Sequence, residues 1–138
     1  MSIPASALII DDENHIRTYL KVLLKRLGVA TTMDASNIDE ARAQLAANKP
    51  ELVTLDLNMP GGSGLDLLRE IRAQDEDIYV VVMSADALTA TIRAAFEAGA
   101  DGFIRKDLPP PQMLEELRKI LADEPPAGSP GAGGSAAG

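Results

Sequence analysis

The sequence predicts an α/β protein in which a parallel β-sheet is covered by helices on both faces. Short apolar runs alternate five times with segments whose apolar residues recur every three or four positions. The apolar runs lack polar alternation, which is typical of strands buried on both faces. Right-handed connections between such strands favour a doubly wound sandwich of strand-helix units.

The first strand is expected at residues 7–10, where an apolar run precedes two aspartates. The helix after it is expected to end near Gly28, because glycine commonly follows the last turn of a helix. The apolar residues of this helix recur at intervals of four, three and four, which gives one apolar stripe. They are Ile16, Leu20, Leu23 and Leu27.

The second strand is expected at residues 29–33. Ser36 with Asp39 resembles a capping box and predicts the start of the second helix, which Pro50 ends. A third strand follows at residues 52–55. The third helix is expected to begin where the same Ser-x-x-Asp pattern recurs, and its apolar residues are Leu65, Leu68 and Ile71.

The fourth strand is expected at residues 78–83, and the helix after it is expected to end at Gly99. Phe103 and Ile104 form the fifth apolar run. The prolines at residues 109–111 suit the first turn of a fifth helix, where the missing N–H costs no hydrogen bond. The apolar residues of that helix are Met113, Leu114, Leu117, Ile120 and Leu121.

These elements predict a flavodoxin-like (βα)5 sandwich with a five-stranded parallel sheet in the order 2-1-3-4-5. This order places a crevice at the carboxyl ends of the first and third strands. Asp11 and Asp12 follow the first strand, and Asp56 follows the third. Three carboxylates gathered at one edge repel one another and favour a divalent cation. Such a cluster suits an aspartate that handles a phosphoryl group.

Composition limits the function further. The chain has 138 residues, a formal net charge of −8 and no cysteine. The negative charge argues against sequence-independent binding to nucleic acid or to an anionic membrane. The missing cysteines exclude disulfides and thiolate metal sites. Since the start of the sequence lacks a signal pattern, we expect a cytoplasmic protein. We expect one domain over residues 1–122 and a flexible tail or truncated linker over 123–138.

Four marks stand at the expected strand ends, and together they are specific. They are the Asp11-Asp12 pair, Asp56 with the following Asn58-Met59-Pro60-Gly61, Ser84, and Lys106. With these marks the chain resembles a two-component response-regulator receiver domain over about residues 5–122, and it is similar to the stand-alone chemotaxis regulators.

The resemblance implies that Asp56 is the phosphoacceptor for a histidine kinase or a histidine phosphotransfer protein. It implies Mg²⁺ as cofactor, bound by Asp12 directly, by Asp11 through water, by Asp56, and by the backbone carbonyl of Asn58. Ser84 and Lys106 would contact the phosphoryl group.

The resemblance also implies a switch. Ser84 would move towards the phosphoryl group while the ring of Phe103 rotates inward, and the surface of the fourth helix, fifth strand and fifth helix would then select a protein partner. The partner is unknown, and the protein would be a monomer or a phosphorylation-dependent dimer. Asp107 stands where the family commonly has proline, so a cis X-Pro bond is not available there.

Two alternatives remain open. The chain could be the receiver half of a larger DNA-binding transcriptional regulator, because the Lys106-Asp107 pair also occurs in such receivers. It could also be a haloacid-dehalogenase-type phosphatase, but those enzymes need a second aspartate where Asn58 stands. Two residues of the first helix carry no expected role in the chemistry: Glu13 is interpreted as a first-turn residue favoured by the helix dipole, and His15 as an exposed helix residue.

Overall fold

The computed structural model describes residues 3–59 and 62–122, which form five strands and five helices in strict alternation. The tail predicted at 123–138 lies outside the described residues. The strands are β1 (Ser6–Ile10), β2 (Thr31–Ala35), β3 (Leu52–Asp56), β4 (Tyr79–Ser84) and β5 (Gly102–Arg105). The helices are α1 (Asn14–Arg26), α2 (Ile38–Ala47), α3 (Gly64–Gln74), α4 (Thr89–Glu97) and α5 (Pro110–Leu121).

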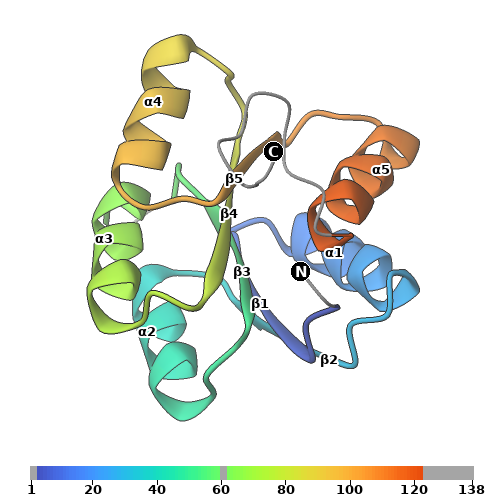
Figure 1. Ribbon diagram of the computed structural model, residues 1–138, viewed down its shortest axis with the longest axis horizontal. Helices are drawn as coiled ribbons and strands as arrows, with labels where there is room; N and C mark the ends of the chain where they lie inside the picture. Colours follow the sequence, from blue (N-terminus) through green and yellow to red (C-terminus); the bar gives the residue numbers. More distant parts are fainter. Residues whose placement is uncertain (1–2, 60–61, 123–138) are drawn as a thin grey trace.

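The strands form one parallel sheet in the order β2-β1-β3-β4-β5, which confirms the predicted flavodoxin-like fold. Helices α2, α3 and α4 cover one face of the sheet, and α1 and α5 cover the other (Figure 1). The chain reverses its direction of winding between β2 and β3. The carboxyl ends of β1 and β3, which are hydrogen-bonded neighbours, therefore meet at the topological switch point, the place where open α/β sheets bind ligands.

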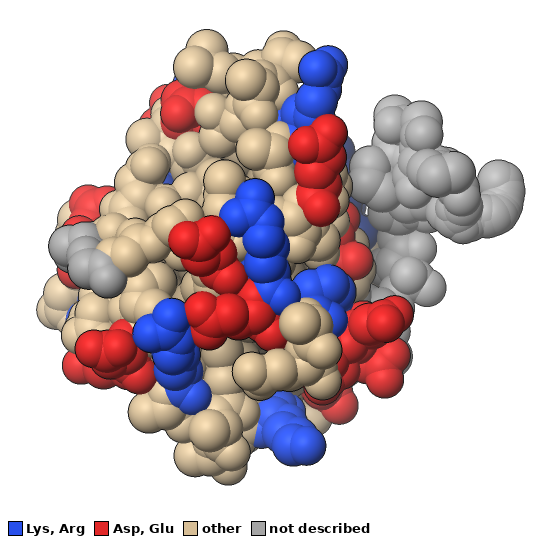
Figure 2. All heavy atoms as spheres, turned by 90° about the vertical axis from the view of Figure 1, so that its left-hand side faces the viewer, with Lys and Arg blue, Asp and Glu red and all other residues tan. Residues whose placement is uncertain are grey.

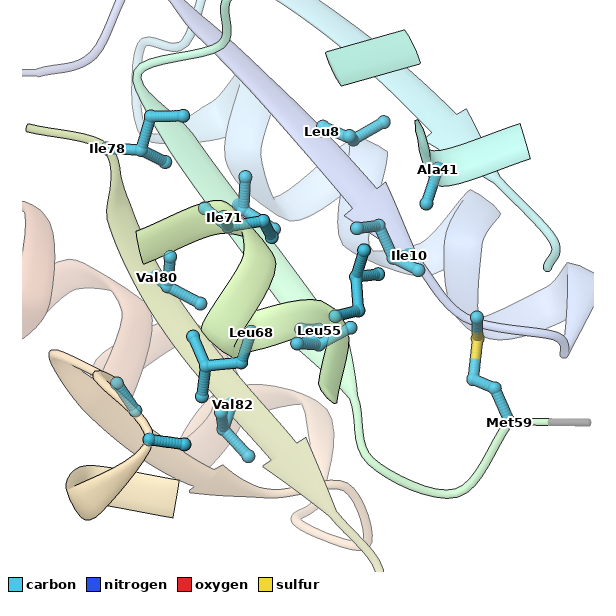
Figure 3. Close-up of a cluster of buried hydrophobic side chains, with 14 of the residues drawn as sticks. Leu8, Ile10, Ala41, Leu55, Met59, Leu68, Ile71, Ile78, Val80 and Val82 are labelled. Carbon is cyan, nitrogen blue, oxygen red and sulfur yellow. The ribbon is translucent and has the colours of Figure 1, made fainter. Parts of the chain in front are cut away.

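The two faces of the sheet bury separate aliphatic cores, because successive strand residues point to opposite faces. Leu8, Ile10, Leu55, Val80 and Val82 pack beneath α2, α3 and α4, as Figure 3 shows. The alternate residues pack against α1 and α5; they include Ala7, Ile9, Leu52, Val81, Met83 and Ile104. Continuous apolar runs in the sequence therefore supply both cores at once.

Two local predictions need correction. The second strand begins at Thr31, not at Val29. Val29 is buried in the core beneath α1 and α5, so its apolar side chain reflects packing of the preceding turn. The predicted cap of the second helix is also wrong by one residue, because Asn37 is the N-cap and accepts from the backbone N–H of Glu40 at 2.8 Å. The carboxylate of Glu40 in turn accepts from Ser36. The third helix begins as predicted, since Ser63 accepts from the N–H of Asp66.

The guanidinium of Arg72 joins the end of α3 to the segments that precede β4 and β5. It donates to the backbone carbonyls of Gly99 at 2.7 Å and Ile78 at 2.8 Å, and to the carboxylate of Asp101 at 2.8 Å. Gly99 has a φ of +117°, and a side chain there would also crowd Arg72. Arg72 thus donates hydrogen bonds to carbonyl groups that lie outside the helices and strands.

Replacing Arg72 by methionine is expected to lower the free energy of unfolding by about 2 kcal/mol, because several charge-assisted hydrogen bonds are lost together. Arg69→Met is the matched control on the same helix. Among the described residues Arg69 pairs only with Asp66, in an exposed contact, so its loss should cost below about 0.5 kcal/mol. Urea denaturation followed by circular dichroism measures both variants. Equal midpoints for the two would contradict this role of Arg72.

The surface over α2, α3 and α4 carries acidic and basic side chains side by side, as Figure 2 shows. One contact between helices there is the pair of Arg42 and Glu70, with a nitrogen-oxygen distance of 2.8 Å. Among the described residues, neither acidic nor basic side chains alone cover this face. Among the same residues, no helix has the length and apolar character needed to cross a membrane.

Candidate functional site

The predicted site residues meet at the carboxyl ends of β1, β3 and β5. Asp11 follows β1, Asp56 ends β3, and Lys106 follows β5. The ammonium of Lys106 lies 3.0 Å from Oδ2 of Asp11 and 3.0 Å from Oδ2 of Asp56. The side chains of both aspartates are 2% exposed. Residues from both ends of the chain therefore share one buried, charged contact.

Asp12 completes an acidic cluster. Carboxylate oxygens of Asp11, Asp12 and Asp56 all lie within 4.8 Å of one another. Asp12 is exposed, whereas the other two side chains are buried. Three carboxylates around one point, one of them open to water, fit the oxygen ligands and retained waters that Mg²⁺ prefers. The cluster can therefore hold Mg²⁺.

Local turns orient the two buried carboxylates. Oδ1 of Asp11 accepts from the backbone N–H of Glu13 at 2.9 Å. Oδ1 of Asp56 accepts from the N–H of Asn58 at 3.0 Å. In each carboxylate, one oxygen thus accepts a hydrogen bond from the following turn and the other contacts Lys106. The backbone carbonyl of Asn58 was predicted to bind metal. In the structure the N–H of Asn58 donates to Asp56, and the residue is exposed.

Burial and hydrogen bonds act in opposite directions on the pKa of Asp11, and likewise on the pKa of Lys106. Burial raises the pKa of Asp11 above its ordinary 3.8, although hydrogen bonds from Glu13 and Lys106 oppose this. Because the folded protein holds that proton more tightly than the unfolded chain, the ionised carboxylate lowers stability as pH rises above 3.8. Burial alone would lower the pKa of Lys106, but its hydrogen bonds to Glu13, Asp11 and Asp56 raise it. Lys106 is therefore a permanent cation in the site.

Glu13 lies in the site, which corrects its interpretation as a first-turn residue only. Its Oε2 accepts from the ammonium of Lys106 at 2.7 Å, across 93 positions of sequence. That hydrogen bond lowers the pKa of Glu13. Glu13 is also the N-cap residue of α1, without a side-chain cap. Sequence spacing gave no sign of this contact, because it depends on how the loops after β1 and β5 approach each other.

Ser84 and Phe103 lie on the neighbouring strands β4 and β5. Ser84 ends β4 and is fully buried, and its Oγ accepts from the N–H of Asp86 at 3.3 Å. Its carbonyl accepts from the N–H of Lys106 at 2.8 Å, which fixes the backbone of that lysine. Phe103 pairs with Val82 in the sheet and lies half-buried against the core beneath α4.

Two further residues shape the site and were not predicted. The guanidinium of Arg17 donates to the backbone carbonyl of Asp11 at 2.7 Å and to the carboxylate of Asp34 at 3.0 Å. It thereby ties the loop after β1 to β2. Gly64, at the start of α3, packs against the backbone that carries Asp56. A Cβ on Gly64 would lie 2.8 Å from Cα of Leu57.

Comparison with known proteins agrees with this geometry. The family model described as the response regulator receiver domain matches residues 7–118. The chain is 34% identical over 113 residues to the chemotaxis protein CheY of Thermotoga maritima, covering 82% of this chain and 94% of that protein. It is 34% identical over 122 residues to the nitrate/nitrite response regulator protein NarL of Escherichia coli K12, covering 88% of this chain.

The chain spans only 56% of the length of NarL. Among solved structures, a two-component response regulator from Clostridium difficile superposes with a TM-score of 0.77. Its sequence identity is 26%, and the match covers 87% of this chain and 97% of that structure.

Proposed function

The chain belongs to the response regulator receiver domain family, and from this membership we propose that Asp56 accepts a phosphoryl group from a histidine kinase or a histidine phosphotransfer protein. The family is one of phosphorylation switches and not of conventional enzymes, so the phosphatase alternative is set aside. We assign the metal to Asp11, Asp12, Asp56 and the carbonyl of Asn58, and the phosphoryl contacts to Ser84 and Lys106.

The observation that supports this proposal best is the contact of Lys106 with two buried carboxylates beside the exposed Asp12. A structural ion pair needs one acid and one base. Here the carboxylates of Asp11, Asp56 and Glu13 contact one lysine, and Asp12 lies beside the two aspartates, so negative charge is in excess in a partly buried place. Such an excess lowers stability. It is explained if the site is built to hold a cation and to carry out chemistry.

The proposed step is a transfer between two nucleophiles. A carboxylate oxygen of Asp56 forms a bond to phosphorus while the phosphorus-nitrogen bond of the donor phosphohistidine breaks, and the imidazole leaves with the electron pair. Mg²⁺ in the acidic cluster would offset the charge of the incoming phosphoryl oxygens. The ammonium of Lys106 donates hydrogen bonds to those oxygens. The turn from Asp56 to Asn58 holds the attacking carboxylate in place.

The proposed response is a population shift. The new phosphoryl group brings about −1.5 to −2 charge and three acceptor oxygens. Ser84 donates its hydroxyl to one of them, and the ring of Phe103 follows inward. The surface of α4, β5 and α5 then selects a protein partner. Leu88, the N-cap residue of α4, and Phe96 within α4 are 65% and 45% exposed. Apolar side chains in water support a protein partner there.

Two forms of the regulator fit the relatives. The match covers 94% of the length of CheY but 56% of the length of NarL. We propose a cytoplasmic receiver that acts through a protein contact. The alternative is the receiver half of a longer DNA-binding regulator, in which the contact partner is an output domain of the same chain.

Metal dependence tests the proposal directly. Acetyl phosphate with Mg²⁺ is expected to add one phosphoryl group to the intact protein, and EDTA is expected to prevent this, because the cluster then lacks its neutralising cation. Intact-mass spectrometry measures the product. Hydroxylamine should remove the group, as expected for an acyl phosphate. If no mass is gained in Mg²⁺, or if an equal gain occurs in EDTA, the proposal is wrong.

A further inference from the structure

We propose that Glu13 is a positioning residue that restrains Lys106 and thereby slows phosphorylation of Asp56. The inference rests on the proposed function and adds a control of the same site by a residue outside the acidic triad. It begins from the hydrogen bond between Lys106 Nζ and Glu13 Oε2, which at 2.7 Å is the shortest of the contacts this ammonium makes in the described structure.

The ammonium of Lys106 has its donors fully engaged. A lysine ammonium has three N–H donors, and the described residues offer it three acceptors: Asp11, Asp56 and Glu13. An arriving phosphoryl group brings new acceptor oxygens to the same place. Lys106 can donate to them only by releasing a present partner or by sharing a donor. The three acceptors therefore compete with the phosphoryl group.

Glu13 is the acceptor that can be released most easily. The Asp11 side chain is 2% exposed, so loss of Lys106 would leave its carboxylate buried without this cation. Asp56 is the reacting group itself. The Glu13 side chain is 45% exposed, and water can replace the lysine there. Release of Glu13 is thus part of reaching the phosphorylated form, and its strength sets part of the barrier.

Lys106 does not need Glu13 to stay in the site. The backbone N–H of Lys106 donates to the carbonyl of Ser84 at 2.8 Å, so the chain is held independently of the side chain. The two buried aspartates retain the ammonium. Loss of Glu13 should therefore free one donor for the phosphoryl oxygens without displacing the lysine.

Two variants separate the hydrogen bond from the charge. Glu13→Gln removes the charge at constant shape. Glu13→Asp keeps the charge but withdraws the carboxylate by one methylene, so the bond to Lys106 is lost or lengthened. Asp107→Asn is the matched control: it removes one charge beside Lys106, but Asp107 pairs with Arg105 instead, at 2.7 Å.

The rate of phosphoryl gain from acetyl phosphate in Mg²⁺ is measured by intact-mass spectrometry. Glu13→Gln and Glu13→Asp are both expected to react about fivefold faster than wild type. This is the rate change expected when one partly exposed ion pair is lost. Asp107→Asn should react at the wild-type rate. The inference is overturned if only Glu13→Gln is faster, which indicates charge repulsion alone, if neither variant is faster, or if Asp107→Asn gains as much.

Failure of this inference differs visibly from failure of the proposed function. If wild type gains phosphate in Mg²⁺ but the Glu13 variants match its rate, Asp56 chemistry stands and only the restraint is wrong. If wild type gains no phosphate, the proposed function itself fails. Circular dichroism of the Glu13 variants verifies folding, which the exposed position of Glu13 should leave unaffected.

Discussion

Asp56→Asn is expected to abolish phosphoryl gain from acetyl phosphate in Mg²⁺. An amide is nearly the same shape as the carboxylate, and its oxygen can still accept the hydrogen bond from the N–H of Asn58. It lacks the negative oxygen that attacks phosphorus. The variant should therefore fold normally and remain at its unmodified mass. Intact-mass spectrometry and circular dichroism on the same sample measure both properties.

Asp66→Asn serves as the control for Asp56→Asn. Asp66 is an exposed residue of α3 that pairs with Arg69. Its variant should gain one phosphoryl group at the wild-type rate. Persistent labelling of the Asp56 variant would show that another residue accepts the phosphoryl group, and the assignment of the nucleophile would then be wrong.

Lys106→Met is expected to make the stability of the protein depend more strongly on a divalent cation than wild-type stability does. In EDTA, the free energy of unfolding should fall by about 3 kcal/mol, because Asp11 and Asp56 lose their shared cation while remaining buried. Mg²⁺ binds the folded cluster and should restore much of this loss. Urea denaturation in EDTA and in Mg²⁺ measures the difference. Phosphoryl gain at Asp56 should continue, more slowly.

Lys119→Met is the control for this effect. Lys119 lies on α5, where its only described acidic contact is Glu116 at 3.9 Å, with both side chains about half exposed. Its loss should change stability by less than about 0.5 kcal/mol in either condition. If the Lys106 variant unfolded at the same urea concentration with and without Mg²⁺, the electrostatic role of this lysine would be refuted.

The fold was predictable because its signals are local and repeated. Apolar runs, helical spacing and glycines at helix ends identified ten elements. The connection rules then favoured a doubly wound sandwich, for which the flavodoxin-like order is a common arrangement. The errors lie where a single residue has two explanations. Val29 is apolar because it fills the core beside α1, not because it belongs to β2. Asn37 and Ser36 are both good capping residues, and only the backbone geometry distinguishes them.

The site was predictable in part. Asp11, Asp12, Asp56 and Lys106 stand at strand ends, and parallel topology brings such ends together. Glu13 was missed, because a glutamate in a first helical turn is common for reasons of helix stability alone. Only the approach of Lys106 gives it a different role.

Arg17 was missed for the same reason as Arg72. Both are arginines within amphipathic helices, and their targets include backbone carbonyls, which leave no mark in a sequence.

The close approach of Gly64 to the backbone of Asp56 and Leu57 has a consequence for how this chain tolerates change. At most helical positions alanine is the most favourable residue. Here a single added carbon would overlap the peptide that carries the proposed phosphoacceptor, so the start of α3 and Asp56 cannot vary independently. The position of the proposed phosphoacceptor thus depends on a residue without a side chain, which itself takes no part in the proposed chemistry.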